Sequence, residues 1–131
     1  MYRLIGAFLA LAVSTTMSAA QGLLPTVWQS NQGAIMKILQ ADPVSGSFTG
    51  IFISGPTGPC PGVPYALAGR VIGNRMVFRN TRSWTFDCRA TTVWSGRLIG
   101  PASLSAFGVT TYFAPDGRVL KSSGTSVFQR I

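Results

Sequence analysis

Residues 90–97 read ATTVWSGR, and their side chains alternate in character from one position to the next. Successive side chains of a β-strand point to opposite faces, so this two-residue period predicts a strand with two different faces. One face carries Ala90, Thr92 and Trp94, and the other ends in Arg97. Such a strand predicts a protein that buries a tryptophan beside a hydroxyl group and turns a cation outward.

Short runs of the same kind recur along the chain, separated by Gly, Pro, Asn and Asp. They predict strands near residues 24–30, 34–40, 47–54, 65–71, 75–82, 90–99, 105–113 and 119–129. The sequence PDG at 115–117 is a specific turn signal between the last two runs. Eight short strands at this spacing favour an all-β fold, either a sandwich or an eight-stranded antiparallel up-and-down β-barrel.

The first twenty residues have the three parts of a secretory signal peptide: a basic start, an apolar stretch and a small-residue end. The apolar stretch is too short to span a bilayer, which needs roughly 20 residues. We therefore expect a signal peptide over residues 1–20, a single domain over residues 21–131, and a secreted or periplasmic location. Removal of Arg3 with the signal peptide lowers the formal net charge from +8 to +7.

The residues that most enzymes use for acid–base chemistry are scarce. The chain has no histidine, and its carboxylates are Asp42, Asp87 and Asp116, two of which lie in turn-like stretches. A catalytic triad or a catalytic pair of carboxylates is therefore not expected. Two cysteines without histidine are too few for a zinc site, so no metal and no cofactor is expected. In a secreted chain, Cys60 and Cys88 are expected to form a disulfide.

Arginines recur on one set of alternate positions in the middle of the chain. The alternation in RMVFRNTR and ATTVWSGR turns Arg75, Arg79 and Arg97 outward, opposite Phe78 and Trp94. This basic stripe is either a solvated face that keeps the protein soluble or a surface that binds anions. A surface for nucleic acid is less favoured, because the aromatic side chains needed for stacking lie on the other faces.

Five segments in order resemble the avidin/streptavidin family, with the closest pattern in its rhizavidin-like, disulfide-containing bacterial members. They are WQSNQGAIMKI (28–38), GSFTGIF (46–52), CPGVPYALAGRVIG (60–73), DCRATTVWSG (87–96) and SGTSVFQRI (123–131). The resemblance covers nearly all of residues 21–131. It implies an up-and-down barrel without enzymatic activity that holds biotin, as a ligand and not a cofactor, at its open end. It also implies a disulfide at the positions of Cys60 and Cys88.

The resemblance assigns positions to a ligand pocket. Thr92 stands at the hydroxyl position near the ligand's sulfur, Trp94 at a wall, and Trp28 at a structural tryptophan. The remaining pocket positions carry Ser30, Ala34, Phe52, Ser54, Ala90, Tyr112 and Ser126.

Most of these positions depart from the family's pattern. Ser30 replaces an asparagine, Ala34 a serine, Phe52 a tyrosine, Ser126 an aspartate and Tyr112 a tryptophan. Ala90 also replaces a serine, and another wall tryptophan falls near Arg82, with Trp84 as a substitute. Each neutral hydrogen bond lost costs roughly 0.5–1.5 kcal/mol, so four or five losses weaken biotin binding by about 4–8 kcal/mol. We therefore expect weak or altered biotin binding in a pocket that is more apolar than the family's.

Three further expectations remain open at this point. In the first, the aromatic side chains fill the barrel completely and leave no pocket. The barrel is alternatively a scaffold that acts through its basic outer surface on an anionic or protein partner. The segment 114–124 lacks the tryptophan with which tetrameric members reach a neighbour, which resembles the dimeric bacterial type. We expect a homodimer whose interface includes the outward-facing Ile51, Ile53, Val93 and Val109.

Overall fold

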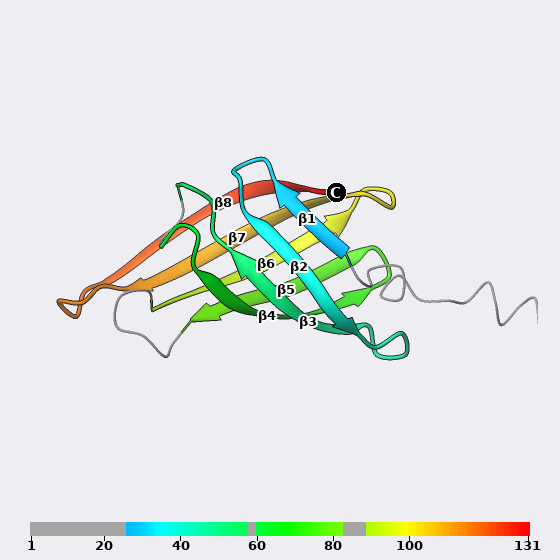
Figure 1. The fold of residues 1–131 in the computed structure, drawn as a ribbon. Coiled ribbons are helices and arrows are strands. Elements are labelled where there is room, and N and C mark those ends of the chain that lie inside the picture. Colours follow the sequence, from blue (N-terminus) through cyan, green and yellow to red (C-terminus); the bar gives the residue numbers. More distant parts are fainter. Residues whose placement is uncertain (1–25, 58–59, 83–88) are drawn as a thin grey trace, which may run out of the picture.

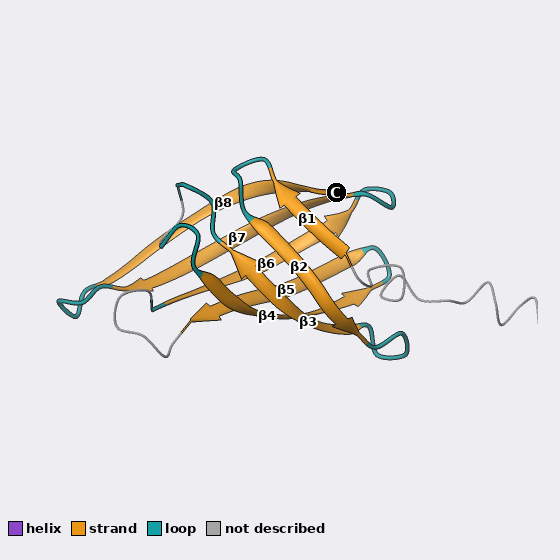
Figure 2. Ribbon diagram, viewed as in Figure 1, coloured by secondary structure: helices purple, strands orange, loops and turns teal. Residues whose placement is uncertain are grey.

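The computed structural model describes residues 26–57, 60–82 and 89–131, without the side chain of Arg82. The described chain forms eight antiparallel strands and no helix (Figures 1 and 2). The strands are β1 (Thr26–Ser30), β2 (Ile35–Ala41), β3 (Ser47–Ile53), β4 (Pro64–Ile72), β5 (Arg75–Arg82), β6 (Ala90–Leu98), β7 (Ser103–Phe113) and β8 (Val119–Arg130).

Each strand pairs with its neighbour in sequence, and β1 pairs with β8, so the sheet closes into a barrel. The predicted barrel is confirmed, and the closing pair excludes a sandwich. The predicted strands are also confirmed to within two residues at each described end. The largest difference is at β7, which begins at Ser103 because its first residues pair with the last residues of β8.

Closure of the barrel depends on a short contact. β1 pairs with β8 only at Phe128, Gln129 and Arg130, whereas β7 pairs with β8 from Val119 to Gln129. Most of β8 consequently extends past its pairing with β1, as part of the long β7–β8 hairpin (Figure 1). Its turn is the predicted PDG segment, in which Gly117 has a φ of +89° that favours glycine.

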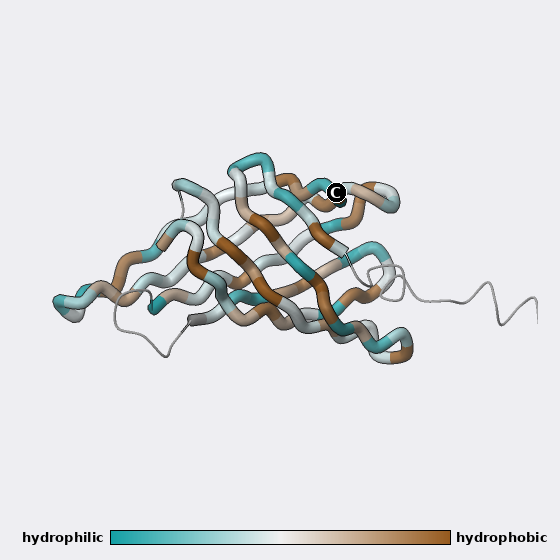
Figure 3. The backbone as a smooth tube through the Cα atoms, in the orientation of Figure 1, coloured by the Kyte–Doolittle hydropathy of each residue, from teal (hydrophilic) through white to brown (hydrophobic). Residues whose placement is uncertain are grey.

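Hydrophobic and hydrophilic residues alternate along the strands (Figure 3), and the inward-facing side chains form the buried core. Trp28, Met36, Ile38, Met76, Leu104 and Phe128 are completely inaccessible to solvent. The Phe128 ring lies 6.3 Å from Phe52, 6.1 Å from Phe78 and 5.5 Å from Trp94, measured between centroids. All three contacts are edge-on, the arrangement that aromatic pairs prefer.

The predicted faces are confirmed for the strands with mixed composition. Phe48, Phe52, Met76 and Phe78 are buried, while Arg75, Arg79 and Arg97 are exposed. The four residues expected at an interface, Ile51, Ile53, Val93 and Val109, lie on two separate parts of the barrel wall. Ile51 and Ile53 are half-buried on β3, which is three strands away from β6 and four from β7. Val93 and Val109 are cross-strand partners, and both are exposed.

The turn between β2 and β3 is fixed by Asp42, whose carboxylate accepts hydrogen bonds from the backbone N–H groups of Val44 and Ser45. These donors favour the ionised form and hold the pKa of Asp42 below its usual value. The stabilising effect is present above the ordinary carboxylate pKa and is lost as the pH falls through the lowered value.

Several expectations concern residues outside the described ranges. They are the signal peptide over residues 1–20, the substitute tryptophan Trp84, and the disulfide, because Cys88 is not described. Within the described part of the chain, no helix has the length and apolar character to cross a membrane.

Phe128→Ala should lower the free energy of unfolding by about 3–5 kcal/mol, because it empties the centre of the aromatic cluster. Phe113→Ala is the matched control, since Phe113 is 39% exposed at the end of β7. It should cost about 1 kcal/mol or less. Urea unfolding followed by circular dichroism measures both changes, and equal losses would contradict the packing described here.

The disulfide prediction has its own measurement. Closing the loop between Cys60 and Cys88 should stabilise the fold by about 3–4 kcal/mol on the chain-entropy model. We expect a reducing agent to lower the free energy of unfolding, measured with urea, by that amount. A thiol titration of the unfolded, unreduced protein that finds two free thiols would exclude the bond.

Candidate functional site

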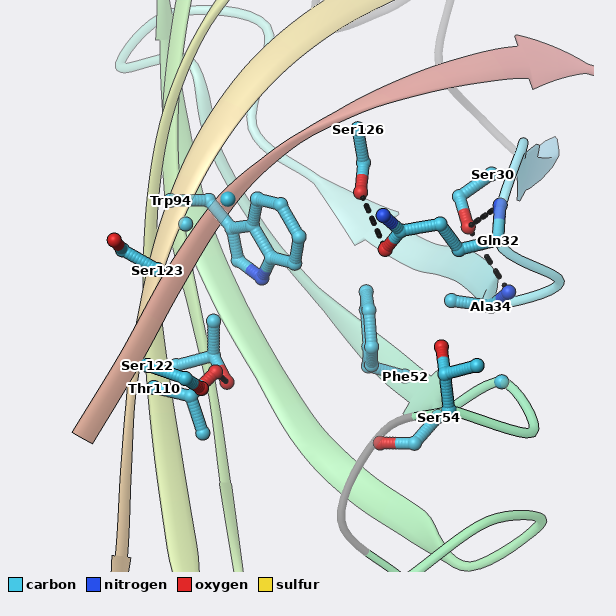
Figure 4. A pocket seen from close by; sticks show the side chains of 15 residues that line it. Ser30, Gln32, Ala34, Phe52, Ser54, Trp94, Thr110, Ser122, Ser123 and Ser126 are labelled. Atoms are coloured by element: carbon cyan, nitrogen blue, oxygen red, sulfur yellow. Dashed lines mark hydrogen bonds between the residues drawn. The ribbon is translucent and has the colours of Figure 1, made fainter. Parts of the chain in front are cut away.

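One end of the barrel holds a cavity of about 200 Å³. Strands β6, β7 and β8 form one wall, and the β1–β2 hairpin with the segment after β3 forms the other (Figure 4). Its lining residues are Ser30, Gln32, Ala34, Phe52, Ser54, Gly55, Thr57, Thr92, Trp94, Gly108, Thr110, Ser122, Ser123, Gly124 and Ser126. The opposite end is filled by Ile38, Met76 and Leu104, so the barrel is only partly filled by its own side chains.

Seven of the nine predicted pocket residues line this cavity: Ser30, Ala34, Phe52, Ser54, Thr92, Trp94 and Ser126. Ala90 and Tyr112 do not. They are cross-strand partners at the end of β6, one inward-facing pair beyond Thr92 and Thr110. Ala90 is buried and Tyr112 packs against the core, so this pair belongs to the barrel interior beyond the cavity.

Trp94 is held by contacts on several sides. Its ring stacks on Phe78 with 5.7 Å between centroids and 14° between planes. Its indole N–H donates a 2.9 Å hydrogen bond to Oδ1 of Asn80, which is 2% exposed. On the neighbouring strand Gly108 leaves room for the ring, since a Cβ there would lie 2.7 Å from an indole carbon. The indole is therefore fixed in place before any ligand arrives.

Asn80 is a residue that the sequence reading missed. It pairs directly with Thr92 across β5 and β6, and the inward period of β5 through Met76 and Phe78 leads to it. The two-residue period of β5 could have identified Asn80, because it puts this polar residue at the third inward-facing position. A buried polar side chain there needs a hydrogen-bond partner.

Hydroxyl groups of the lining form hydrogen bonds at two places. Thr92 and Thr110, which are cross-strand partners, share a 2.7 Å hydrogen bond between their hydroxyl oxygens. Ser30 accepts hydrogen bonds from the backbone N–H groups of Gln32 at 3.2 Å and Ala34 at 3.0 Å. Ser30 thus closes the β1–β2 hairpin with its two lone pairs and keeps its own proton for another acceptor.

Gln32 links the two walls across the cavity. The Ser126 hydroxyl donates to Oε1 of Gln32 at 3.1 Å, although the residues are 94 positions apart (Figure 4). The same amide carries two N–H donors, and the Ser126 oxygen keeps its lone pairs. Gln32 lies in a turn, where no strand period indicates which way a side chain points, so the sequence reading missed it.

Solved structures resemble this barrel over most of its length. Bradavidin2 in complex with biotin is 26% identical, with a TM-score of 0.69 over 82% of this chain and 96% of that chain. Rhizavidin in complex with biotin is 24% identical, with a TM-score of 0.68 over 82% and 91%. Short afifavidin in complex with biotin is 21% identical, with a TM-score of 0.68 over 88% and 100%. No sequence-family model and no curated protein matches the chain.

The chain is an avidin-like barrel. The resemblance read from the five sequence segments is thereby confirmed at the level of the fold. The likeness extends to nearly the whole length of the three neighbours, so it concerns the complete barrel and not a shared hairpin.

The cavity of this avidin-like barrel is rich in hydroxyl groups. Eight of its fifteen lining residues carry a hydroxyl group, and none carries a charge. Ala34 and Phe52 indeed offer no side-chain donor, but Thr110, Ser122 and Ser123 bring hydroxyls that the sequence reading did not assign. The cavity is also smaller than the roughly 300 Å³ that is usual for ligand pockets. It therefore suits a compact, neutral and polar group.

Ser30→Ala should lower the free energy of unfolding by about 1–3 kcal/mol, because two backbone N–H groups of the hairpin lose their acceptor. Ser126→Ala removes one side-chain bond to Gln32, whose amide remains open to water, and should cost less. Chemical unfolding of both variants makes the comparison. A larger loss at Ser126 would mean that the two walls, and not the hairpin, depend on these serines.

Proposed function

We propose that this avidin-like barrel binds biotin, or a small ligand of similar shape and polarity, in the cavity at its open end. The observation that carries the proposal is Trp94, which is fixed by Phe78, Asn80 and Gly108 beside the Thr92 hydroxyl. The 26% identity to bradavidin2, a neighbour solved with biotin, supports it. The barrel is a binding protein and not an enzyme, in keeping with its avidin neighbours.

The hydrogen-bonding groups of the cavity favour a ureido ring, which offers one acceptor and two donors. The Ser30 hydroxyl and the Gln32 amide supply donors for the ureido oxygen. The Ser126 oxygen supplies an acceptor for a ureido N–H group, and the Thr92 hydroxyl stands at the position expected near the ligand's sulfur. Ala34 and Phe52 supply nothing to the same oxygen, so the proposed site has fewer partners than the family's pattern. Gln32 replaces part of what is lost, which places the weakening toward the lower end of the expected range.

Calorimetry of biotin with the oxidised protein without its signal peptide should give a Kd at or below about 1 μM, equivalent to −8.2 kcal/mol. Trp94→Ala should weaken binding at least a hundredfold, because it removes a wall that needs no reorganisation. Tyr112→Ala, just beyond the cavity, should change binding less than tenfold. If biotin produces neither heat nor a thermal shift in the wild type, the proposal fails and other compact neutral ligands remain to be screened.

Ligand affinity should be constant between about pH 6 and pH 9. No residue that lines the cavity in the described chain is titratable, so protonation has no group through which to act. Calorimetry at the two ends of this range checks the prediction. A tenfold change across it would mean that an ionisable group outside the described lining contacts the ligand.

We also propose that the protein acts outside the cytoplasm and that it forms a homodimer. The signal-peptide pattern supports the first point. The second rests on the adjacent, exposed Val93 and Val109 with Phe107 next to them on β7. Light scattering coupled to gel filtration tests the dimer, and a monomer at micromolar concentration would exclude it.

A further inference from the structure

The outer face of β4, β5 and β6 carries four exposed arginines: Arg70, Arg75, Arg79 and Arg97. The strand register places them around one residue. Val77 lies between Arg75 and Arg79 on the outward face of β5, and Arg70 is its partner on β4. Arg97 is the cross-strand partner of Arg75. The face therefore holds four positive charges within the space of a few side chains.

None of these four arginines forms an ion pair with a carboxylate of the described chain. The ion pair found there joins Arg118 to Asp116, and the Asp42 carboxylate accepts backbone hydrogen bonds in its own turn. Arg70 donates from Nε to the carbonyl oxygen of Ser45, which is neutral. Directly opposed residues on neighbouring strands have Cβ atoms about 4.5–5.5 Å apart, and like charges in that position are destabilising. Arg75 and Arg97 stand in this unfavourable arrangement.

The surface is hollowed where Arg75 and Arg97 meet. A depression of about 270 Å³ is lined by Arg75, Ser95, Gly96, Arg97, Ser105, Ala106, Phe107 and Thr125. It shares no residue with the cavity at the barrel end. Two guanidinium groups and three hydroxyl groups surround it, and no carboxylate does. All of these groups can donate hydrogen bonds, which is the composition of a site for an oxyanion.

We propose that this depression is a phosphate-binding site, distinct from the cavity, and that its ligand carries at least two phosphate groups. One phosphate lies between Arg75 and Arg97, where guanidinium forks match its oxygens and Ser95 and Ser105 donate from below. Arg79 and Arg70, on the far side of Val77, hold the second. Bases of nucleic acid would find little to stack on, because Phe78 faces the interior and Phe107 is the single aromatic ring of the depression.

Titration with inorganic tripolyphosphate at low salt tests the site. The double variant R75Q/R97Q should weaken binding at least tenfold, because it removes both guanidinium groups from the depression. The matched control is K37Q/R130Q, which removes two exposed positive charges from β2 and β8. Its net charge equals that of R75Q/R97Q. The control should weaken binding less than threefold. Equal weakening in the two variants, or no binding by the wild type, would overturn the proposal.

Two additional readouts separate the site from general charge effects. Relief of the repulsion should raise the Tm of R97Q in buffer without phosphate, and tripolyphosphate should raise the Tm of the wild type much more than that of R75Q/R97Q. A lower Tm for R97Q, with full stabilisation of R75Q/R97Q by tripolyphosphate, contradicts the site. Unchanged biotin heats in R75Q/R97Q would show that the barrel itself is intact.

The source of the phosphates is decided by a second arm with phosphatidylglycerol vesicles. A lipid ligand predicts that vesicle binding falls at least tenfold in R75Q/R97Q and not in K37Q/R130Q. A soluble ligand predicts this selective loss with tripolyphosphate alone. A protein that shows the selective loss with neither probe has no phosphate site at this face.

Discussion

Phe128 connects the closure of the barrel to the shape of its interior. The strand that carries it pairs with β1 through only three residues, and Phe128 is the first of them. Its ring touches Phe52, Phe78 and Trp94, which come from three other strands. The residue at which the first and last strands pair thus also belongs to the aromatic cluster at the bottom of the cavity. Above this cluster the side chains become small and hydroxylated, and the space they leave is the cavity.

The strands and their faces could be predicted because each depends on local information. A two-residue period decides which side chains face inward, and it placed Thr92, Trp94 and the three arginines of the stripe correctly. The same period extended through β5 identifies Asn80. The two-residue period does not tell how far along the barrel axis an inward-facing side chain lies. Tyr112 faces the same way as Thr110, yet it lies beyond the cavity, and only the register of β6 against β7 decides this.

Other residues of the cavity depend on parts of the fold that have no period. Gln32 comes from a turn, and its contact with Ser126 joins segments from the two ends of the chain. Ser122 and Ser123 line the cavity because β8 extends past its short pairing with β1 and continues beside β7, which follows from strand stagger. The count of polar groups made from the sequence was incomplete for this reason. It included the polar groups lost at family positions, and it had no means to include those gained elsewhere.

The overhang of β8 has a consequence for how the protein behaves at high concentration. From Val119 to Thr125, the side of β8 that faces away from β7 has no strand partner within the described chain. A free row of backbone N–H and C=O groups is a template on which another chain can add a strand. Lys121 interrupts this edge with a charge, the device by which natural sheets discourage such addition. The strand stagger that gives the cavity its outer wall therefore also leaves an unpaired strand edge that favours aggregation. Lys121 is the charged residue that opposes strand addition at this edge.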